Sequence, residues 1–284
     1  MKKMKQPEHF KIRSVETIFG ACGFLCLFIF CLISVLAPWL SPHALDTSFF
    51  PFLSPSWQHP LGTNDMGYDI FSELLHSSRV SLIIGLVAAS ISAFIGSLIG
   101  IVSGYFRGIM GEMVTGAIDL FLLIPALPLM IILASYLGAS IWNIVFVIVL
   151  LGWCSTARAV RAKTLKLREL PFIDAMIALD IPVTRILSRH ILPNVMEIIS
   201  AKFVVSVAGA MLSEASLSFL GLGDPTKVSW GTMMHYAFKR GGFANGMWFW
   251  YLPPGLCIAV CAMSFVLIGL YFSKRDNGAI PWWQ

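Results

Sequence analysis

The chain has 284 residues, of which 57% are hydrophobic and only 12% are charged, and its formal net charge at pH 7 is +5. A soluble globular domain carries roughly 25% charged residues, so the composition excludes that class, and the small positive charge does not require a nucleic-acid partner. Several uncharged runs exceed the roughly 20 residues that cross a bilayer as a helix. The sequence therefore predicts an all-α polytopic protein surrounded by membrane lipid.

Six membrane-spanning helices are expected in chain order. Uncharged runs place three of them, within residues 17–45, 80–106 and 241–273. Another run, 120–157, is too long for one span, and "YLGASIW" (136–142) is expected to divide it into a helical hairpin. The remaining span is expected at about 195–219, where charged residues lie only near the two ends.

The first apolar segment follows a basic start, "MKKMKQ", which is also typical of a signal peptide. From Ile18 to Leu36 this segment is longer than the roughly 7–15 apolar residues of a signal-peptide core. The stretch "VLAPWL" also offers no clean cleavage site between small residues. We therefore expect an uncleaved first span.

The distribution of Lys and Arg predicts the orientation. Most of these residues lie before span one, after span two, between spans four and five, and after span six. These regions alternate along the chain, so the positive-inside rule places them and both termini in the cytoplasm. The resulting regions are a cytoplasmic N-terminus (1–16), a first span (17–40), an extracytoplasmic segment (41–78), a five-span core (79–273) and a cytoplasmic tail (274–284). The core includes a cytoplasmic loop at 158–194.

The extracytoplasmic segment contains four prolines, which prevent long regular structure in its first part. From about Asp65 the pattern changes, and apolar residues recur on one helical face at Ile70, Phe71, Leu74 and Leu75. This pattern predicts a short amphipathic helix at the outer membrane interface, leading into span two. Span two is rich in Gly, Ala and Ser, which let helices approach closely in lipid, so we expect it inside the helix bundle.

A basic stretch punctuated by prolines, "LRELPFIDAMIALDIPVTRILSRHILPN" (167–194), interrupts the apolar runs. Pro171 can occupy the first turn of a helix, where its missing N–H costs nothing, and Pro182 ends the pattern. Between them one apolar stripe with helical spacing is formed by Phe172, Ala175, Met176 and Leu179. A two-turn helix is not stable alone in water. It should form only when packed on its own protein, in a partner's groove, or as a connector on the membrane surface.

Two acids, Asp119 and Glu214, have the most apolar surroundings in the chain. Because an ionisable group in a span is a candidate functional residue, Asp119, Ser213, Glu214 and Ser216 are candidates for a translocation path. Alternatively, both acids lie near helix ends or are satisfied by neighbouring helices. Four histidines on the predicted outer side, His43, His59, His76 and His235, hint at a metal-chelate substrate. They lack the spacing of metal ligands, so we expect no metal site in the chain itself.

The loop at 167–194 partly matches the EAA loop of permease subunits in ABC importers, whose pattern is E-A-A, three residues, G, nine residues, then I-x-L-P. Asp174, Ala175 and Met176 occupy its first three positions and Asp180 its glycine position. Matches to the dipeptide/oligopeptide/nickel permease family are "HPLGTNDMGYDIFSELL" (59–75), "GYFRG" (104–108), "IDLFLLIPALPL" (118–129), "RHILPN" (189–194), "SEASLSFLGLG" (213–223) and "SWG" (229–231). The chain therefore resembles a second-type permease of this family.

The resemblance implies six transmembrane helices with a cytoplasmic coupling helix between spans four and five. It implies that the residues coupled to the ATPase are Phe172, Asp174, Ala175, Met176, Leu179 and Asp180. The implied partners are a homologous sister permease in a heterodimer, one or two cytoplasmic ATPase subunits and an extracytoplasmic solute-binding protein. The implied location is the prokaryotic cytoplasmic (inner) membrane.

The chain is expected to be a transport subunit and not an enzyme. It contains no G-x-x-x-x-G-K-[ST] phosphate-binding motif, so it is expected to bind no cofactor, and ATP and Mg would bind to the partner ATPases. The implied cargo is di- or oligopeptides or similar small solutes, and the same architecture could import nickel or another metal-chelate. A more distant alternative is a secondary transporter driven by an ion gradient, which usually has inverted repeats and ion ligands at the membrane midplane.

Overall fold

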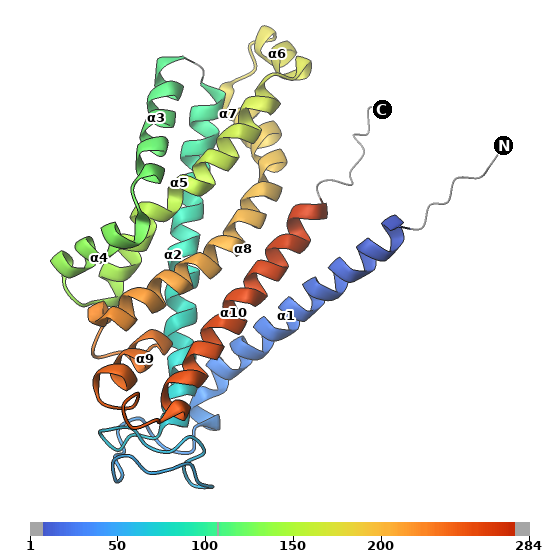
Figure 1. Cartoon of the computed structure of the whole chain (residues 1–284). Helices are drawn as coiled ribbons and strands as arrows, with labels where there is room; N and C mark the ends of the chain where they lie inside the picture. The colour runs from blue at the N-terminus through green and yellow to red at the C-terminus, as the bar shows by residue number, and fades with distance from the viewer. Residues whose placement is uncertain (1–7, 107, 276–284) are drawn as a thin grey trace.

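The computed structural model describes residues 8–106 and 108–275, and these residues are predominantly helical (Figure 1). Residues 1–7, Arg107 and 276–284 lie outside the described part, and with them much of the predicted cytoplasmic N-terminus and tail. Within the described ranges there is no β-strand, and the only extended pairing is an isolated bridge between Thr63 and Asp69. The predicted all-α polytopic class is confirmed.

Five helical segments are long and apolar enough to cross a membrane. They are part of α1 (Glu8–Leu40), all of α2 (Ile70–Tyr105) and α5 (Ile141–Arg168), a continuous run from Val183 to Leu222, and most of α10 (Trp248–Arg275). The continuous run comprises α7 (Val183–Ile186), η1 (Leu187–Ile191), α8 (Leu192–Leu217) and η2 (Ser218–Leu222). A sixth span exists if α3 (Ile109–Leu123) and α4 (Ala126–Leu137), which are bent by 86° relative to each other, count as one.

The third span differs from its prediction. The expected break at 136–142 is present between α4 and α5, where Gly138 has φ +86°. A second break falls between α3 and α4, inside the arm that was expected to be one helix. Ile124 there is extended (φ −76°, ψ 130°), because the ring of the following Pro125 disfavours helical geometry in the residue before it.

The helices next to the loops also begin elsewhere than expected. The amphipathic helix predicted from about Asp65 is not separate, because its residues from Ile70 onward form the first turns of α2. The last span, expected within residues 241–273, begins at Trp248, after turns in which Gly241 and Gly246 have positive φ. A short helix that was not predicted, α9 (Trp230–Lys239), precedes these turns. Hydropathy marks a long apolar run but not the turn that interrupts it.

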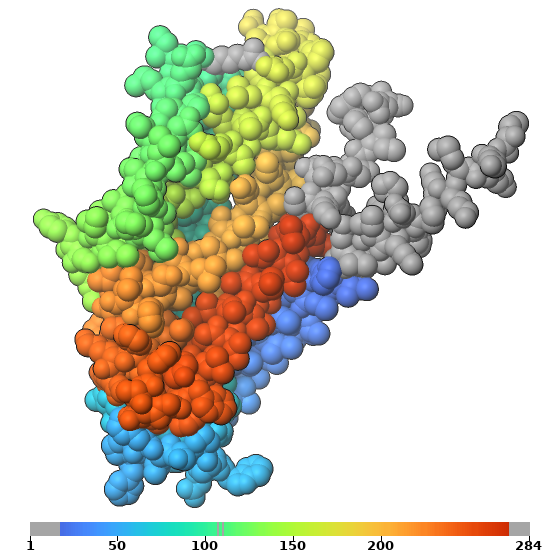
Figure 2. All heavy atoms as spheres, viewed as in Figure 1, coloured from blue at the N-terminus to red at the C-terminus, as the bar shows by residue number. Residues whose placement is uncertain are grey.

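The two ends of the molecule differ in character (Figure 1). The short helix α6 (Pro171–Ala178) lies at one end, beside the ends of α2 and α5. Residues 41–69, which we call the 41–69 segment, form loops without long helices at the opposite end. Figure 2 shows both regions projecting beyond the packed helices.

Candidate functional site

The helix predicted at Pro171 is confirmed and is α6. Pro171 occupies its first turn, where the missing N–H leaves no hydrogen bond unmade. Leu170 before it is extended, with φ −76° and ψ 135°, as a residue before proline prefers. The backbone therefore starts this helix where the sequence indicates.

The face of α6 that packs on the chain is anchored by Ile173, which is fully buried. Ile173 contributes to an apolar cluster together with half-buried Met176 and with buried residues from five other helical segments, namely Ile101, Tyr105, Val160, Ile186, Ile191 and Val195. The cluster joins α6 to α2, α5, α7 and the start of α8. The sequence did not indicate the role of Ile173, because the spacing of a stripe does not show which side of a short helix faces the protein.

The opposite face of α6 carries apolar side chains that nothing in the described chain covers fully. The side chains of Phe172 and Leu179 are 46% and 74% exposed, and Ala175 is exposed as well. Of the predicted stripe, only Met176 turns partly inward. Large apolar side chains at this exposure are expected to meet a partner or lipid.

A polar contact fixes the start of α6 to the end of α5. Arg168 donates a hydrogen bond to Asp174 at 2.6 Å, and its guanidinium also lies 5.5 Å from the centre of the Tyr105 ring. Asp174 lies in the first turn, where a negative charge complements the helix dipole. The sequence placed Asp174 in this turn but gave no indication of its partner Arg168.

Asp180 ends α6 in a left-handed conformation, with φ +53°. The Asp180 N–H donates to the carbonyl of Ile177 at 3.0 Å, and the Ile181 N–H donates to the carbonyl of Met176 at 3.1 Å. This pair of bonds is a Schellman motif, whose left-handed position usually holds glycine. Asp180 therefore keeps the backbone turn that the glycine of the EAA pattern would make.

The two long helices that hold α6 pack closely on each other. Along one face of α2, Gly96 and Gly100 are spaced by four residues, and a Cβ at either position would lie 2.6 and 2.8 Å from the carbonyl oxygens of Trp153 and Ala157 on α5. This close approach confirms the interior position expected for span two. It makes α2 and α5 one packed unit to which α6 is attached.

Comparison with known proteins identifies the family. Residues 96–275 match the family model described as the inner membrane component of binding-protein-dependent transport systems. The chain belongs to this family. The matched region of the permease includes α6, α8 and the ends of α2 and α5 that hold α6.

Relatives of the permease extend the match. A Brucella suis (biovar 1, strain 1330) protein, provisionally named a peptide permease, is 36% identical over 219 residues, covering 76% of this chain and 72% of that protein. The dipeptide transport system permease protein DppC of Bacillus subtilis (strain 168) is 30% identical over 249 residues, covering 87% of this chain and 77% of that protein. The permease is thus a transport component and not itself an ATPase.

The four residues predicted for a translocation path lie on two helices of the permease. Asp119, on α3, forms an ion pair with Arg158 on α5, and both side chains are about half exposed. Ser213, Glu214 and Ser216 lie on α8, where Ser213 and Ser216 are half-buried. The Ser216 hydroxyl donates back to the Leu212 carbonyl at 2.7 Å.

Glu214 is the most enclosed of these residues, with 1% exposure. It accepts hydrogen bonds from the hydroxyls of Ser218 at 2.7 Å and Ser81 at 3.4 Å. Ser81 in turn accepts from the Trp230 N–H at 3.2 Å, so the contacts join α8 to α2 and α9. Both acids are therefore satisfied by neighbouring helices, and their part in a translocation path stays a prediction.

Proposed function

We propose that the permease is one transmembrane subunit of an ATP-driven ABC importer for di- or oligopeptides or similar small solutes. The peptide cargo is supported by the names of the relatives from Brucella suis and Bacillus subtilis. In this proposal a homologous sister permease completes the translocation path, and one or two ATPase subunits bind ATP and Mg. The observation that carries the coupling role is the exposed apolar face of α6.

The proposed orientation puts α6 in the cytoplasm and the 41–69 segment outside, where a solute-binding protein would deliver cargo. It is supported by the basic residues of the loop at 158–194 and the positive-inside rule. The permease would then lie in the prokaryotic inner membrane with both termini in the cytoplasm. This is also the side on which ATP is available to the partner subunits.

The physical role of α6 is to seat its exposed side chains in a groove of the ATPase. Burial of large apolar side chains such as Phe172 and Leu179 releases roughly 1.5–3 kcal/mol each before the entropy of association is subtracted. A hollow of about 420 Å³ beside α6, lined by Tyr105, Ile181 and other residues, leaves room for a partner's side chain. Because α6 is anchored to α2 and α5 through Ile173, a displacement of α6 would move both helices.

Two alternatives differ in cargo or in energy source. The same architecture importing nickel or a metal-chelate is distinguished by ligand binding to the cognate solute-binding protein. A secondary transporter would continue uptake in vesicles without ATP. The exposed face of α6 favours the ATP-driven importer, since a secondary transporter requires no motor protein at that position.

The test uses the purified importer with its partner subunits and measures ATP turnover stimulated by substrate and binding protein. Phe172→Ala removes exposed apolar area, and Ala175→Asp places a charge in the proposed contact. Both variants should reach the membrane in normal amounts and lose most of the stimulated turnover. Phe50→Ala, at an 80% exposed side chain in the 41–69 segment, is the matched control and should leave the amount of ATPase that co-purifies with the permease unchanged. Normal stimulated turnover in both α6 variants would refute the proposal.

A further inference from the structure

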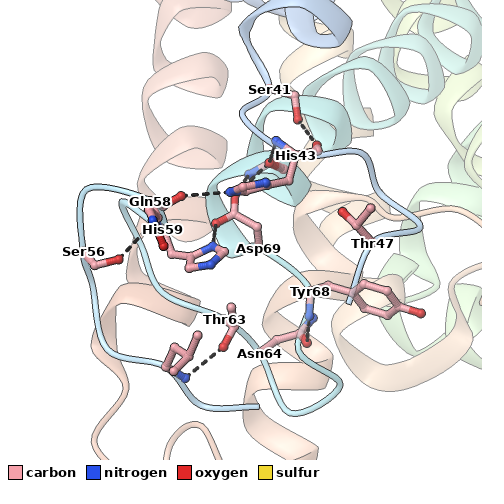
Figure 3. Close-up of polar contacts among 12 residues, drawn as sticks. Ser41, His43, Thr47, Ser56, Gln58, His59, Thr63, Asn64, Tyr68 and Asp69 are labelled. Atoms are coloured by element: carbon pink, nitrogen blue, oxygen red, sulfur yellow. Dashed lines mark hydrogen bonds and ion pairs between the residues drawn. The ribbon is translucent and has the colours of Figure 1, made fainter. Parts of the chain in front are cut away.

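Three residues with metal-binding side chains converge in the 41–69 segment, although the sequence spacing indicated no such group (Figure 3). His43 follows the end of α1, His59 lies in the loop, and Asp69 is the N-cap of α2. One donor atom from each lies within 4.8 Å of the other two. His59 and Asp69 are buried, at 5% and 3% exposure, and His43 is half-buried.

The carboxylate of Asp69 is held in place by the helix that it caps. One oxygen accepts from the backbone N–H of Ser72 at 2.8 Å and from the Ser72 hydroxyl at 2.7 Å. The other oxygen lies 3.0 Å from Nδ1 of His59. One oxygen is thus used by the cap, and the second accepts from Nδ1 of His59, so an ion bound between these two atoms would replace the proton on that nitrogen.

The two imidazoles are also oriented before any ligand binds. Their ring centres are 4.8 Å apart, and each ring lies against Phe49, at 4.7 Å for His43 and 4.6 Å for His59. Nε2 of His43 is 2.9 Å from the carbonyl oxygen of Gln58. Because a carbonyl only accepts, this nitrogen carries the proton, and Nδ1 of the neutral ring keeps its lone pair. Metal-binding histidines commonly donate their other N–H to a backbone carbonyl in this way.

We propose that His43, His59 and Asp69 form a binding site for a divalent transition metal ion, with Zn²⁺ as the best match. Two imidazoles and one carboxylate are a donor set typical of zinc sites with three protein ligands, which leave a coordination position open. Carbonyl and water ligands alone would suit Mg²⁺ or Ca²⁺, whereas imidazole favours zinc and its neighbours in the transition series. In this proposal the metal ion is a bound structural component of the permease and not its transported cargo.

A bound ion would tie together the two helices that enter and leave the 41–69 segment. His43 lies three residues after the last residue of α1, Leu40, and Asp69 immediately precedes α2. An ion that binds only the folded state stabilises it in proportion to the logarithm of its concentration over its dissociation constant. The ion would therefore act as a clamp that fixes the outer loop on the helix bundle.

The experiment titrates Zn²⁺ into the full-length permease, purified with its partner subunits through a tag without histidine and stripped with a chelator. The wild type should bind one Zn²⁺ per permease with saturation, and its unfolding temperature should rise with added Zn²⁺. His43→Ala should weaken binding at least about tenfold and abolish the rise. His235→Ala removes a half-buried histidine outside the cluster and should behave as the wild type does.

Cobalt absorption provides a second measurement that needs no variant. Co²⁺ bound by nitrogen and oxygen ligands with low coordination number should give intense visible bands in the wild type, and added Zn²⁺ should remove them. The proposal is overturned if the wild type shows no saturable Zn²⁺ binding and no Co²⁺ bands. It is also overturned if His43→Ala binds Zn²⁺ as tightly as the wild type, in which case the contacts of Phe49, His59 and Asp69 are only structural.

Discussion

The two ends of the permease are held by different kinds of interaction. The 41–69 segment is tied by polar contacts within itself and to the helices, such as the 3.2 Å ion pair between Asp65 and Arg240 and the capping bonds of Asp69. The short helix α6 is held mainly by its one fully buried side chain, Ile173, with one hydrogen bond from Arg168 to Asp174, and it leaves Phe172 and Leu179 exposed. The 41–69 segment also exposes apolar side chains, with Phe50 at 80% and Trp57 at 103%, so the two ends differ in how they are held and not in whether they expose apolar surface.

The difference separates a segment that stabilises the fold from a helix that we propose transmits the movement of the ATPase. The 41–69 segment satisfies its backbone through tight turns, in which Gly62 and Gly67 have positive φ. A short helix such as α6, with few internal hydrogen bonds of its own, takes its stability from packing. We therefore expect substitutions at the two ends to act on different properties.

The largest effect is expected at Ile173. Ile173→Ala leaves a cavity where the side chain is fully buried, and such truncations cost about 2–5 kcal/mol. Amide hydrogen exchange in α6 should accelerate and stimulated ATP turnover should fall, while exchange in the 41–69 segment stays unchanged. Ile173→Val, which costs about 0.5–1.5 kcal/mol, is the graded control. If Ile173→Ala accelerated amide exchange equally in α6 and in the 41–69 segment, the two ends would not be independent in stability.

A smaller destabilisation, at the other end of the molecule, is expected at Gly62. This glycine has φ +74°, and an added Cβ would lie 2.2 Å from the Leu53 carbonyl oxygen. Gly62→Ala should cost about 1–3 kcal/mol through backbone strain, with a further cost from the clash. Limited proteolysis should then cut the 41–69 segment faster and leave α6 unaffected. Gly116→Ala, at a helical glycine with open space around it, should leave the proteolysis pattern as it is. Resistance of the Gly62 variant would show that the segment tolerates movement here.

The smallest effect is expected at Asp180. Its left-handed backbone is one that glycine adopts without strain, so Asp180→Gly should stabilise the end of α6 by at most about 1 kcal/mol. Exchange of the Ile181 amide, which is bonded to Met176, should slow or stay equal. Faster exchange would mean that the Asp180 side chain holds the turn through a contact of its own.

The sequence predicted the features that depend on local chemistry. Pro171 located the start of α6, and the small residues of span two indicated its interior position. The sequence did not predict that Ile173 anchors α6, because both faces of this short helix are apolar. It also did not predict the group of His43, His59 and Asp69, since loop turns and not a regular period bring these residues together. The bend before Pro125 was missed because hydropathy averages over it.

The proposed contact between the exposed face of α6 and the ATPase can be measured by crosslinking. A photoreactive amino acid at Leu179, which is 74% exposed, tests it directly in the assembled importer, with the same group at Phe50 as the control at the opposite end. We expect a crosslink to the ATPase subunit from position 179 and none from position 50. Crosslinks from position 179 only to lipid, or crosslinks to the ATPase from position 50, would contradict it.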